Sequence, residues 1–185
     1  MIDLRALVRD VPDFPRKGIL FRDITPLLSD PRALAQAIRQ MGERLERPDA
    51  LVAIESRGFI FGSGLALHWG VPFVPARKFG KLPGRTVREV YSLEYGEDTL
   101  ELHADAIRAG ARVVIVDDLL ATGGTAAAAA RLVEQLEGRV MALVFLIELA
   151  GLGGREKLAS YPVEALIEYG AGAQVTPARG KGGRP

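Results

Sequence analysis

Cysteine is absent from the 185 residues, which excludes disulfides, thiol nucleophiles and cysteine-ligated zinc. Aromatic side chains are scarce at 6%, and the longest unbroken apolar run, Val140 to Ile147, has only eight residues. A helix that crosses a bilayer needs about 20 residues. No basic segment followed by an apolar stretch opens the chain, so we expect no secretory leader. These absences favour a cytoplasmic protein with no membrane partner.

An excess of charge of either sign is also missing. The 24 Lys and Arg residues nearly balance the 23 Asp and Glu residues, for a net charge of +1. Three of the basic residues, Arg179, Lys181 and Arg184, stand close to the C-terminus, so the rest of the chain is nearly neutral. That distribution is not typical of a nucleic-acid-binding protein. We therefore expect no nucleic-acid partner, and any anionic ligand must be held by a local arrangement of groups.

Apolar runs alternate with helical patterns along the chain, as in βαβ units on a mainly parallel sheet. A chain of this length can bury one core without splitting. We predict an α/β fold in which residues 1–175 form a single domain, its central mainly parallel sheet flanked by helices, and residues 176–185 form a flexible tail. The expected strands are residues 50–54, 71–74, 99–103 (antiparallel), 111–116, 139–147 and 163–167. The expected helices are residues 31–46, 58–69 and 125–136.

Local signals support two of these helices. Asp30 followed by Pro31 is typical of an N-cap and a first helical residue. Gly62 and Gly64 fall inside the helix expected at residues 58–69 rather than at a strand–helix turn. We therefore expect these glycines to allow close packing and not to bind phosphate.

The most informative stretch is an apolar strand that runs into two carboxylates, Asp117 and Asp118, and then into a turn of small residues before a helix. Ligands bind at the carboxyl ends of strands in open α/β sheets, and carboxylates accept hydrogen bonds from sugar hydroxyls. The turn Ala121-Thr122-Gly123-Gly124-Thr125 offers N–H groups and hydroxyls at a helix N-terminus, which suits phosphate. A capped helix beside solvated aspartates would explain the acid pair alone, but not the whole combination. The stretch predicts a site for a ribose 5-phosphate.

Two further segments carry groups suited to anions. Glu55-Ser56-Arg57-Gly58 joins an apolar strand to a helix, and Arg57 supplies a cationic fork for phosphate oxygens. A Gly- and Pro-rich loop begins with three basic residues, Arg77, Lys78 and Lys81. The simpler alternative to an anion-binding role is that these residues form a solvated basic loop. A loop that closes over a departing pyrophosphate would neutralise its charge and exclude water. No cluster has metal-ligand spacing, so no protein-held metal is expected.

The stretch around Asp117 resembles the phosphoribosyl-pyrophosphate motif of the type I phosphoribosyltransferase family, in the form found in its adenine-using members. The resemblance extends from about Asp13 to Tyr169 and departs from the family pattern at Phe79, where relatives carry proline or a polar residue. It includes six further motifs in order: Asp13-Phe14-Pro15, Phe21-Arg22-Asp23-Ile24, Glu55-Ser56-Arg57-Gly58-Phe59, Arg77-Lys78, Gly80-Lys81-Leu82-Pro83-Gly84 and Tyr91-Ser92-Leu93-Glu94-Tyr95-Gly96.

The resemblance implies transfer of phosphoribosyl from phosphoribosyl pyrophosphate to adenine, giving AMP and pyrophosphate. It implies Glu94, Lys81 and Arg57 as catalytic residues, with Glu94 moving a proton at the base. It also implies a non-proline cis peptide within residues 55–58. The implied substrate-binding residues are Leu20, Phe21, Arg22, Glu55, Ser56, Arg57, Arg77, Lys78, Lys81, Tyr95, Asp117, Asp118, Ala121, Thr122, Gly123, Gly124 and Thr125.

The resemblance further implies a base-binding hood within about residues 1–30 and a mobile catalytic loop at residues 79–96. Magnesium would arrive with the pyrophosphate donor, the partners would be small-molecule substrates, and the protein would act as a homodimer. Two alternatives stay open: a phosphoribosyltransferase for another base, and a regulator that binds the donor without chemistry. Fewer than 50 residues precede the first predicted strand, and they lack a basic helix-turn-helix pattern, which disfavours a DNA-binding regulator.

Overall fold

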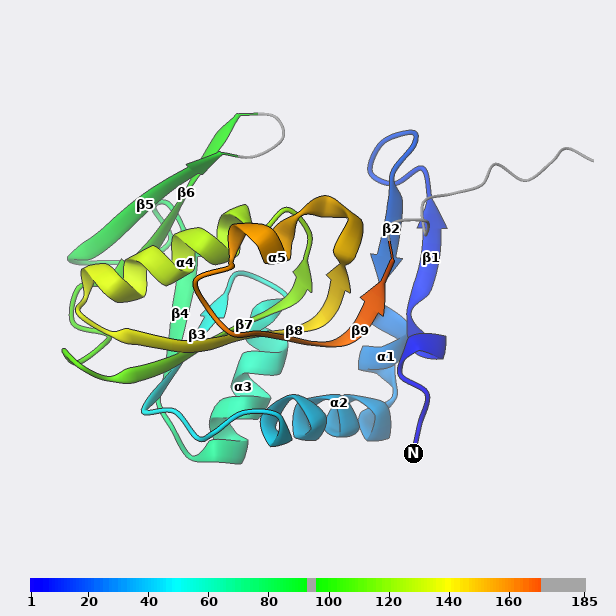
Figure 1. Ribbon diagram of the computed structural model, residues 1–185, viewed down its shortest axis with the longest axis horizontal. Coiled ribbons are helices and arrows are strands. Elements are labelled where there is room, and N and C mark those ends of the chain that lie inside the picture. Colours follow the sequence, from blue (N-terminus) through cyan, green and yellow to red (C-terminus); the bar gives the residue numbers. More distant parts are fainter. Residues whose placement is uncertain (93–95, 171–185) are drawn as a thin grey trace, which may run out of the picture.

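The computed structural model describes residues 1–92 and 96–170, and its centre is a seven-stranded sheet in the order β5-β6-β4-β3-β7-β8-β9 (Figure 1). Five strands are parallel, and β5 and β6 form an antiparallel pair at one edge. The fold is therefore of the predicted α/β class with a mainly parallel sheet. The strand bounds are β3 Ala50–Ile54, β4 Phe73–Lys78, β5 Thr86–Ser92, β6 Glu97–His103, β7 Arg112–Leu120, β8 Arg139–Leu149 and β9 Val163–Tyr169.

Helices cover both faces of the sheet (Figure 1). α2 (Pro31–Glu43) and α3 (Gly58–Trp69) pack on one face, and α4 (Gly124–Gln135) and the short α5 (Gly154–Lys157) lie on the other. Each face of the sheet has its own hydrophobic core, and alternate residues of the central strands point into one or the other. Leu51 and Val114 are buried toward α2 and α3, whereas Val52 and Ile115 are buried toward α4. Because both faces are covered, these strands are apolar throughout, as the sequence shows.

The N-terminal segment forms a separate small sheet beside β9 (Figure 1). β1 (Arg9–Pro12) and β2 (Leu20–Asp23) pair antiparallel, and α1 (Thr25–Ser29) leads from them into α2. A short 3-10 helix, Arg5–Leu7, precedes β1. The family resemblance implied a hood segment here, but the sequence patterns predicted none of these elements.

Local signals for the helices are confirmed. The Asp30 side chain accepts hydrogen bonds from the N–H groups of Arg32 and Ala33 at 2.9 and 3.2 Å, so it caps α2, which ends at Glu43 rather than near residue 46. α3 has the predicted bounds and ends at Gly70, whose φ of 61° is left-handed. A methyl group at Gly62 or Gly64 would collide with Ala53 or Ile38 respectively. Both glycines are therefore packing residues.

β6, β8 and β9 each extend two residues beyond their predicted bounds, and three further strands of the main sheet differ from the sequence prediction in ways that affect the site. β4 begins at Phe73 and ends at Lys78, so Arg77 and Lys78 belong to a strand and not to a flexible excursion. β7 continues to Leu120, because its pairing with β8 runs past the acid pair. The predicted loop at residues 79–96 contains β5, which is paired with β6 along its whole length. β5 pairs with charged residues from other elements, and local sequence periodicity contains no information about such contacts.

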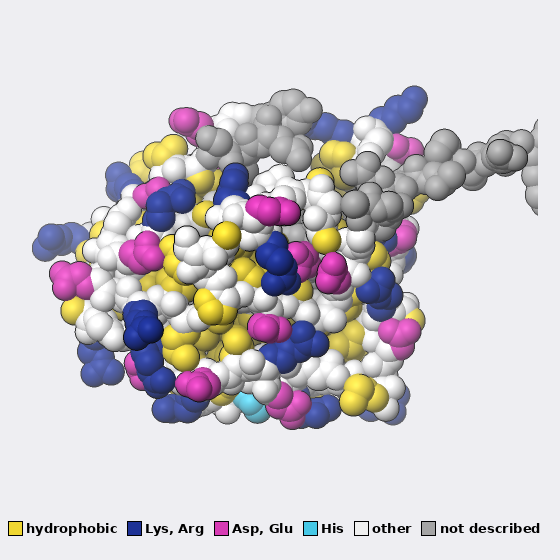
Figure 2. Space-filling model, in the orientation of Figure 1, with side chains coloured by type: hydrophobic (Ala, Val, Ile, Leu, Met, Phe, Trp, Pro, Cys, Tyr) yellow, Lys and Arg dark blue, Asp and Glu magenta, His cyan; other side chains and the backbone are white. Residues whose placement is uncertain are grey.

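Basic and acidic side chains are interspersed over the face shown in Figure 2, in line with the near-zero net charge. Within residues 1–92 and 96–170, no helix has the length and apolar content to cross a membrane.

Candidate active site

The parallel pairing of β3 with β7 brings the two predicted anion-binding segments together. Ala53 lies opposite Val116 in the register, so the loop after β3 emerges beside Asp117 and Asp118. Arg57 Nε lies 3.1 Å from Asp118 Oδ2. The approach requires glycine at residue 58, since a Cβ there would lie 2.9 Å from both Asp117 Oδ1 and the Val116 carbonyl oxygen. The structure therefore brings these two segments together at the ends of neighbouring strands.

The two acidic side chains sit in the final part of β7 and have different surroundings. Asp118 is only 5% exposed, and its own N–H donates to Asp117 Oδ1 at 2.8 Å. Burial raises the pKa of Asp117, and the neighbouring charge of Asp118 raises it further. Burial also raises the pKa of Asp118, but the Arg57 guanidinium opposes that shift. The pair concentrates negative charge that bound hydroxyls or a cation would relieve.

The turn after β7 has the geometry of an anion site. Gly123 has a φ of 75° and is the N-cap of α4, a helix of 12 residues. Four members of the turn are partly exposed: Ala121, Thr122, Gly124 and Thr125. Thr125 also bonds the hydroxyl of Tyr91 on β5. N–H groups at the positive end of a helix suit a phosphate, and the assignment of residues 121–125 to phosphate stays a prediction.

The loop after β3 is tied to β4 by its first residue. The peptide between Glu55 and Ser56 is cis, as the family resemblance implies. Arg77 donates to both Glu55 oxygens, at 2.9 and 3.3 Å, and the Lys78 N–H donates to Glu55 at 2.9 Å. The Arg77 side chain holds the pKa of Glu55 below its usual range. Glu55 and Arg77 are therefore partners of each other, while Arg57 remains the cation that faces the acid pair.

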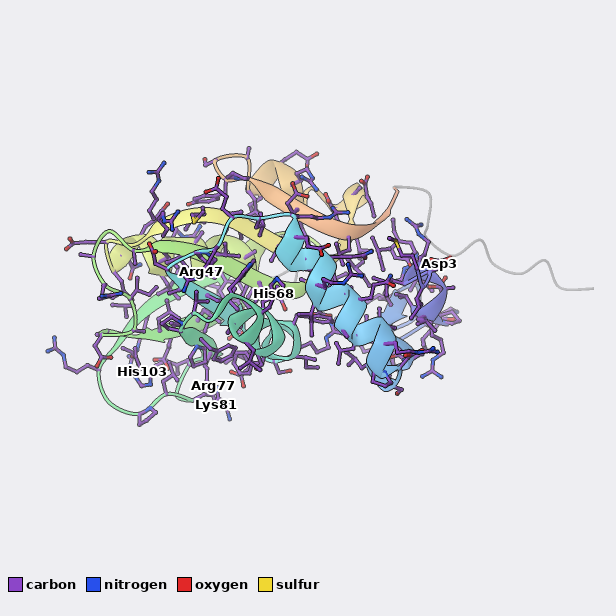
Figure 3. All side chains as sticks on the ribbon, turned by 90° about the horizontal axis from the view of Figure 1, so that it is seen from below. Asp3, Arg47, His68, Arg77, Lys81 and His103 are labelled. Atoms are coloured by element: carbon purple, nitrogen blue, oxygen red, sulfur yellow. The ribbon has the colours of Figure 1, made fainter. Side chains whose placement is uncertain are left out.

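The two lysines predicted to bind the pyrophosphate have different surroundings. Lys78 Nζ lies 3.1 Å from Asp98 Oδ2, and this pairing raises the pKa of Lys78. Lys81 is exposed, and its carbonyl accepts a bond from Arg77 at 3.2 Å; Figure 3 shows Arg77 and Lys81 side by side. Phe79, the departure from the family pattern, lies 58% exposed beneath the Arg88 guanidinium at 4.7 Å.

The N-terminal sheet reaches the same place. The Arg57 guanidinium lies 5.3 Å from the centre of the Phe21 ring, so β2 meets the loop after β3. The Arg22 side chain is buried, forms an ion pair with Asp10 and lies over the Tyr169 ring at 3.9 Å. Leu20 and Phe21 are partly exposed on β2. Arg22 can therefore meet a ligand mainly through its backbone.

Some predictions fall outside the described residues. They are the catalytic Glu94, the neighbouring Tyr95, and the tail at residues 176–185.

Sequence reasoning missed five residues that shape the site's surroundings: Tyr91, Asp98, Glu101, Glu148 and Arg155. Glu101 and Glu148 are 1% and 3% exposed. Glu148 directly follows the apolar run of β8, and this was an available signal because a buried charge requires a partner, whereas Glu101 stands at a polar position of an alternating strand and gave no such signal.

Comparisons with known proteins agree with this geometry. A family model described as "Phosphoribosyl transferase domain" matches residues 23–176. The adenine phosphoribosyltransferase of Natranaerobius thermophilus is 53% identical over 171 residues, covering 91% of this chain and 100% of the relative. That of Synechococcus sp. CC9605 is 56% identical with the same coverage. The crystal structure of adenine phosphoribosyltransferase from Thermoanaerobacter pseudethanolicus matches with a TM-score of 0.88 at 51% identity, covering 90% of this chain and 98% of that one. The chain belongs to the adenine phosphoribosyltransferase family.

Proposed function

We propose that this protein transfers the phosphoribosyl group of phosphoribosyl pyrophosphate to adenine, forming AMP and releasing pyrophosphate. The observation that carries the proposal is the junction of Arg57, the Asp117–Asp118 pair and the phosphate turn 121–125 at adjacent strand ends. Relatives named adenine phosphoribosyltransferase, at 53–56% identity, support the same activity.

The donor would be held in three places. The N–H groups of residues 121–125 bind the 5-phosphate, and Asp117 and Asp118 accept hydrogen bonds from the ribose hydroxyls. Residues 55–57, together with Lys78 and Lys81, face the pyrophosphate. The glycosidic C1–O bond breaks with its electron pair going to pyrophosphate, adenine N9 bonds to C1 from the opposite face, and N9 loses its proton. Arg57 and the lysines stabilise the departing charge, while the acid pair stabilises the positive charge that develops on the ribose.

The base would lie against β2. Leu20 and Phe21 offer apolar surface, and the Arg22 backbone offers N–H and C=O groups because its side chain is engaged by Asp10 and Tyr169. Glu94 and Tyr95, outside the described residues, keep their predicted roles in proton transfer at the base and in closing the site. The Saccharomyces cerevisiae adenine phosphoribosyltransferase, 46% identical, was crystallised with adenine and a bisphosphate, which supports this substrate class.

We expect magnesium to bind together with the donor. Within the part of the chain that the structure describes, no three His, Asp or Glu side chains cluster as metal ligands. Mg²⁺ commonly keeps several waters and binds through substrate phosphates, so we expect the donor's phosphates to hold the ion. When bound, the ion would neutralise the phosphate oxygens.

A homodimer and a cytoplasmic location also remain proposals. The apolar side chains of Ile60 and Leu67 on α3 are 38% and 84% exposed, and Leu67 lines a hollow. The hollow is lined by Ser63, Ala66, Leu67, Gly70, Val71 and Phe73. An exposed apolar face beside a hollow favours contact with a second copy of the chain.

The test measures pyrophosphate release from the donor with adenine, hypoxanthine and guanine. Adenine presents an amino donor at position 6 and an acceptor at N1, and hypoxanthine reverses both. Two mispaired buried groups, at about 1–3 kcal/mol each, predict roughly thousandfold selectivity. If hypoxanthine or guanine comes within about tenfold of adenine in kcat/KM, the base assignment fails. Binding of the donor without pyrophosphate release from any base would instead indicate a regulator.

A further inference from the structure

Gly154, between β8 and β9, forms the back wall of the phosphate turn. A Cβ on Gly154 would collide with the carbonyl oxygen of Ala121 and would lie 2.8 Å from a methyl group of Leu120. A Cβ on Gly123 would lie 2.8 Å from the carbonyl oxygen of Gly154. The backbone at Gly154 is therefore in direct contact with the backbone at Ala121 and Gly123, and a displacement of one would displace the other.

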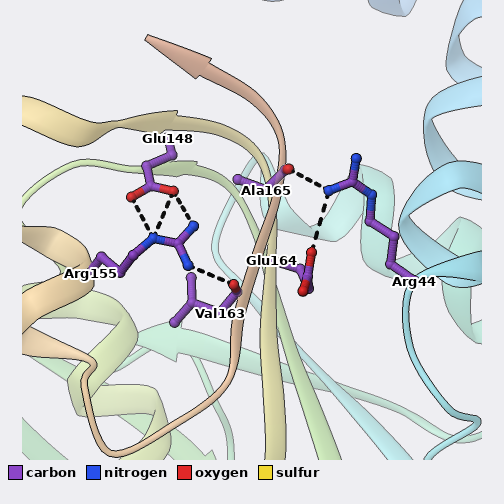
Figure 4. A network of polar contacts seen from close by, with 6 residues as sticks. All are labelled: Arg44, Glu148, Arg155, Val163, Glu164 and Ala165. Carbon is purple, nitrogen blue, oxygen red and sulfur yellow. Dashed lines mark hydrogen bonds and ion pairs between the residues drawn. The ribbon is translucent and has the colours of Figure 1, made fainter. Parts of the chain in front are cut away.

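One arginine holds this wall in place. Arg155 follows Gly154 directly, and its Nε donates to both oxygens of Glu148 at 2.9 and 3.2 Å, while Nη2 makes a further short contact with the same carboxylate. Its Nη1 donates to the Val163 carbonyl at 2.8 Å, which attaches α5 to the start of β9 (Figure 4). All three groups of contacts use the fixed planar fork of the guanidinium.

The acidic partner stands at a position that connects directly to the turn. Glu148 on β8 is 3% exposed and lies opposite Leu120 of β7, the residue immediately before Ala121. A buried ion pair is weak evidence for a contribution to stability, because desolvation offsets its attraction. The ion pair between Glu148 and Arg155 has a strict geometry, however, and this geometry constrains where the backbone next to Arg155 lies.

We infer that Glu148 and Arg155 are positioning residues for phosphate binding. They hold residues 153–154 against residues 121–123 and so set the direction of the N–H groups that face the 5-phosphate. The inference rests on the proposed function and adds two residues, neither of which touches substrate, to the machinery of donor binding.

The test compares Arg155→Met with Arg44→Met. Figure 4 shows why Arg44 is a matched control: it also pairs with a glutamate, Glu164 at 3.3 Å, and donates to a β9 carbonyl, Ala165 at 2.8 Å, but it does not lead to the phosphate turn. Calorimetry measures the affinity for ribose 5-phosphate, and steady-state kinetics gives kcat and both KM values. Melting temperatures are recorded for each variant.

We expect Arg155→Met to weaken ribose 5-phosphate binding and to raise KM for the donor by about tenfold or more, because small displacements of binding groups are amplified in a preorganised site. KM for adenine should change less than about twofold. Arg44→Met should leave the affinity for ribose 5-phosphate and both KM values near those of the wild type. An Arg155→Met protein that melts lower but keeps its affinity for ribose 5-phosphate overturns the inference, since the pair would then be structural only.

A second variant tests the contact itself. Gly154→Ala directs one methyl group at the Ala121 carbonyl, and Gly138→Ala, where a Cβ meets Val133 at 2.8 Å, is its control away from the turn. Only Gly154→Ala should raise KM for the donor; equal effects from both variants contradict the inference. A wild-type protein that neither binds ribose 5-phosphate nor releases pyrophosphate would refute the proposed function itself, a distinct result.

Discussion

Asp117 is held in a setting that favours its protonated form. Burial and the charge of Asp118 raise its pKa, so the folded protein retains this proton to a higher pH than the unfolded chain does. Between the unfolded and folded pKa values the folded state binds more protons, and the free energy of unfolding therefore falls as pH rises. Above the folded pKa the full penalty of the buried charge is present.

Because the pKa of Asp117 is raised in the folded state, we predict that Asp117→Asn is more stable than the wild type at pH 7. The stability difference should shrink as pH falls toward the unfolded pKa of the carboxyl and disappear below it, because both proteins are then neutral at this position. The Asn Oδ1 can still accept the bond that the Asp118 N–H donates at 2.8 Å. Urea unfolding between pH 4 and pH 8 measures the difference. An Asn variant that is less stable at pH 7 contradicts the account of Asp117.

The acid pair also predicts a loss of turnover. Asp117→Asn combined with Asp118→Asn keeps the side-chain shapes but removes the charge proposed to hold the ribose and stabilise its developing cation. We expect kcat to fall by about 100-fold or more while the far-UV spectrum stays native. Near-normal turnover would exclude these two residues from the mechanism.

At the scale of elements, a buried glutamate connects β6 to the segment that carries Lys81. Glu101 accepts bonds from the Gly80 N–H at 2.9 Å, the Thr86 hydroxyl at 3.2 Å and Arg88 Nε at 2.8 Å. These three donors lie at the start of the predicted loop and on β5. The carboxylate therefore determines where β5 begins and where the lysine segment turns.

Glu101→Gln should lower the free energy of unfolding by about 1–3 kcal/mol, because an amide places a donor against another donor in a buried site. Glu97→Gln, at an exposed position on the same strand, is the control. Urea unfolding measures both, and KM for the donor reports any movement of Lys81. Equal stabilities of the two variants would show that Glu101 does not anchor the segment.

Local patterns predicted most of the regular elements. β3 and α3 were predicted with their final bounds, because a five-residue apolar run and a left-handed terminal glycine are local signals. β5 was not predicted, because the partners of its Glu89 are Arg131 and Gln135 on α4, more than 40 residues away in the sequence. Such pairs depend on the order of the strands, which a local window does not contain.

At the scale of the whole molecule, the proposed homodimer would cover the apolar face of α3. Leu67 is 84% exposed there, so Leu67→Glu would bury a charge in a two-copy interface. We expect this variant to elute as a monomer in size-exclusion chromatography with light scattering. Lys157→Glu on α5 places a glutamate away from α3, with a larger change in net charge than Leu67→Glu makes, and should still elute like the wild type. A dimeric Leu67→Glu protein would place the interface elsewhere.

The amino-acid sequence by itself determined the α/β class, the central strands, and the glycine turn and helix after the acid pair. It did so because apolar runs, glycine turns and caps act within a few residues of one another. Only the tertiary structure decided that Arg57 faces Asp118, that Glu55 is taken by Arg77, and that Arg155 fixes the wall behind Ala121. Those contacts depend on which parallel strands are neighbours and in what register, and hydrogen bonding between distant segments sets both.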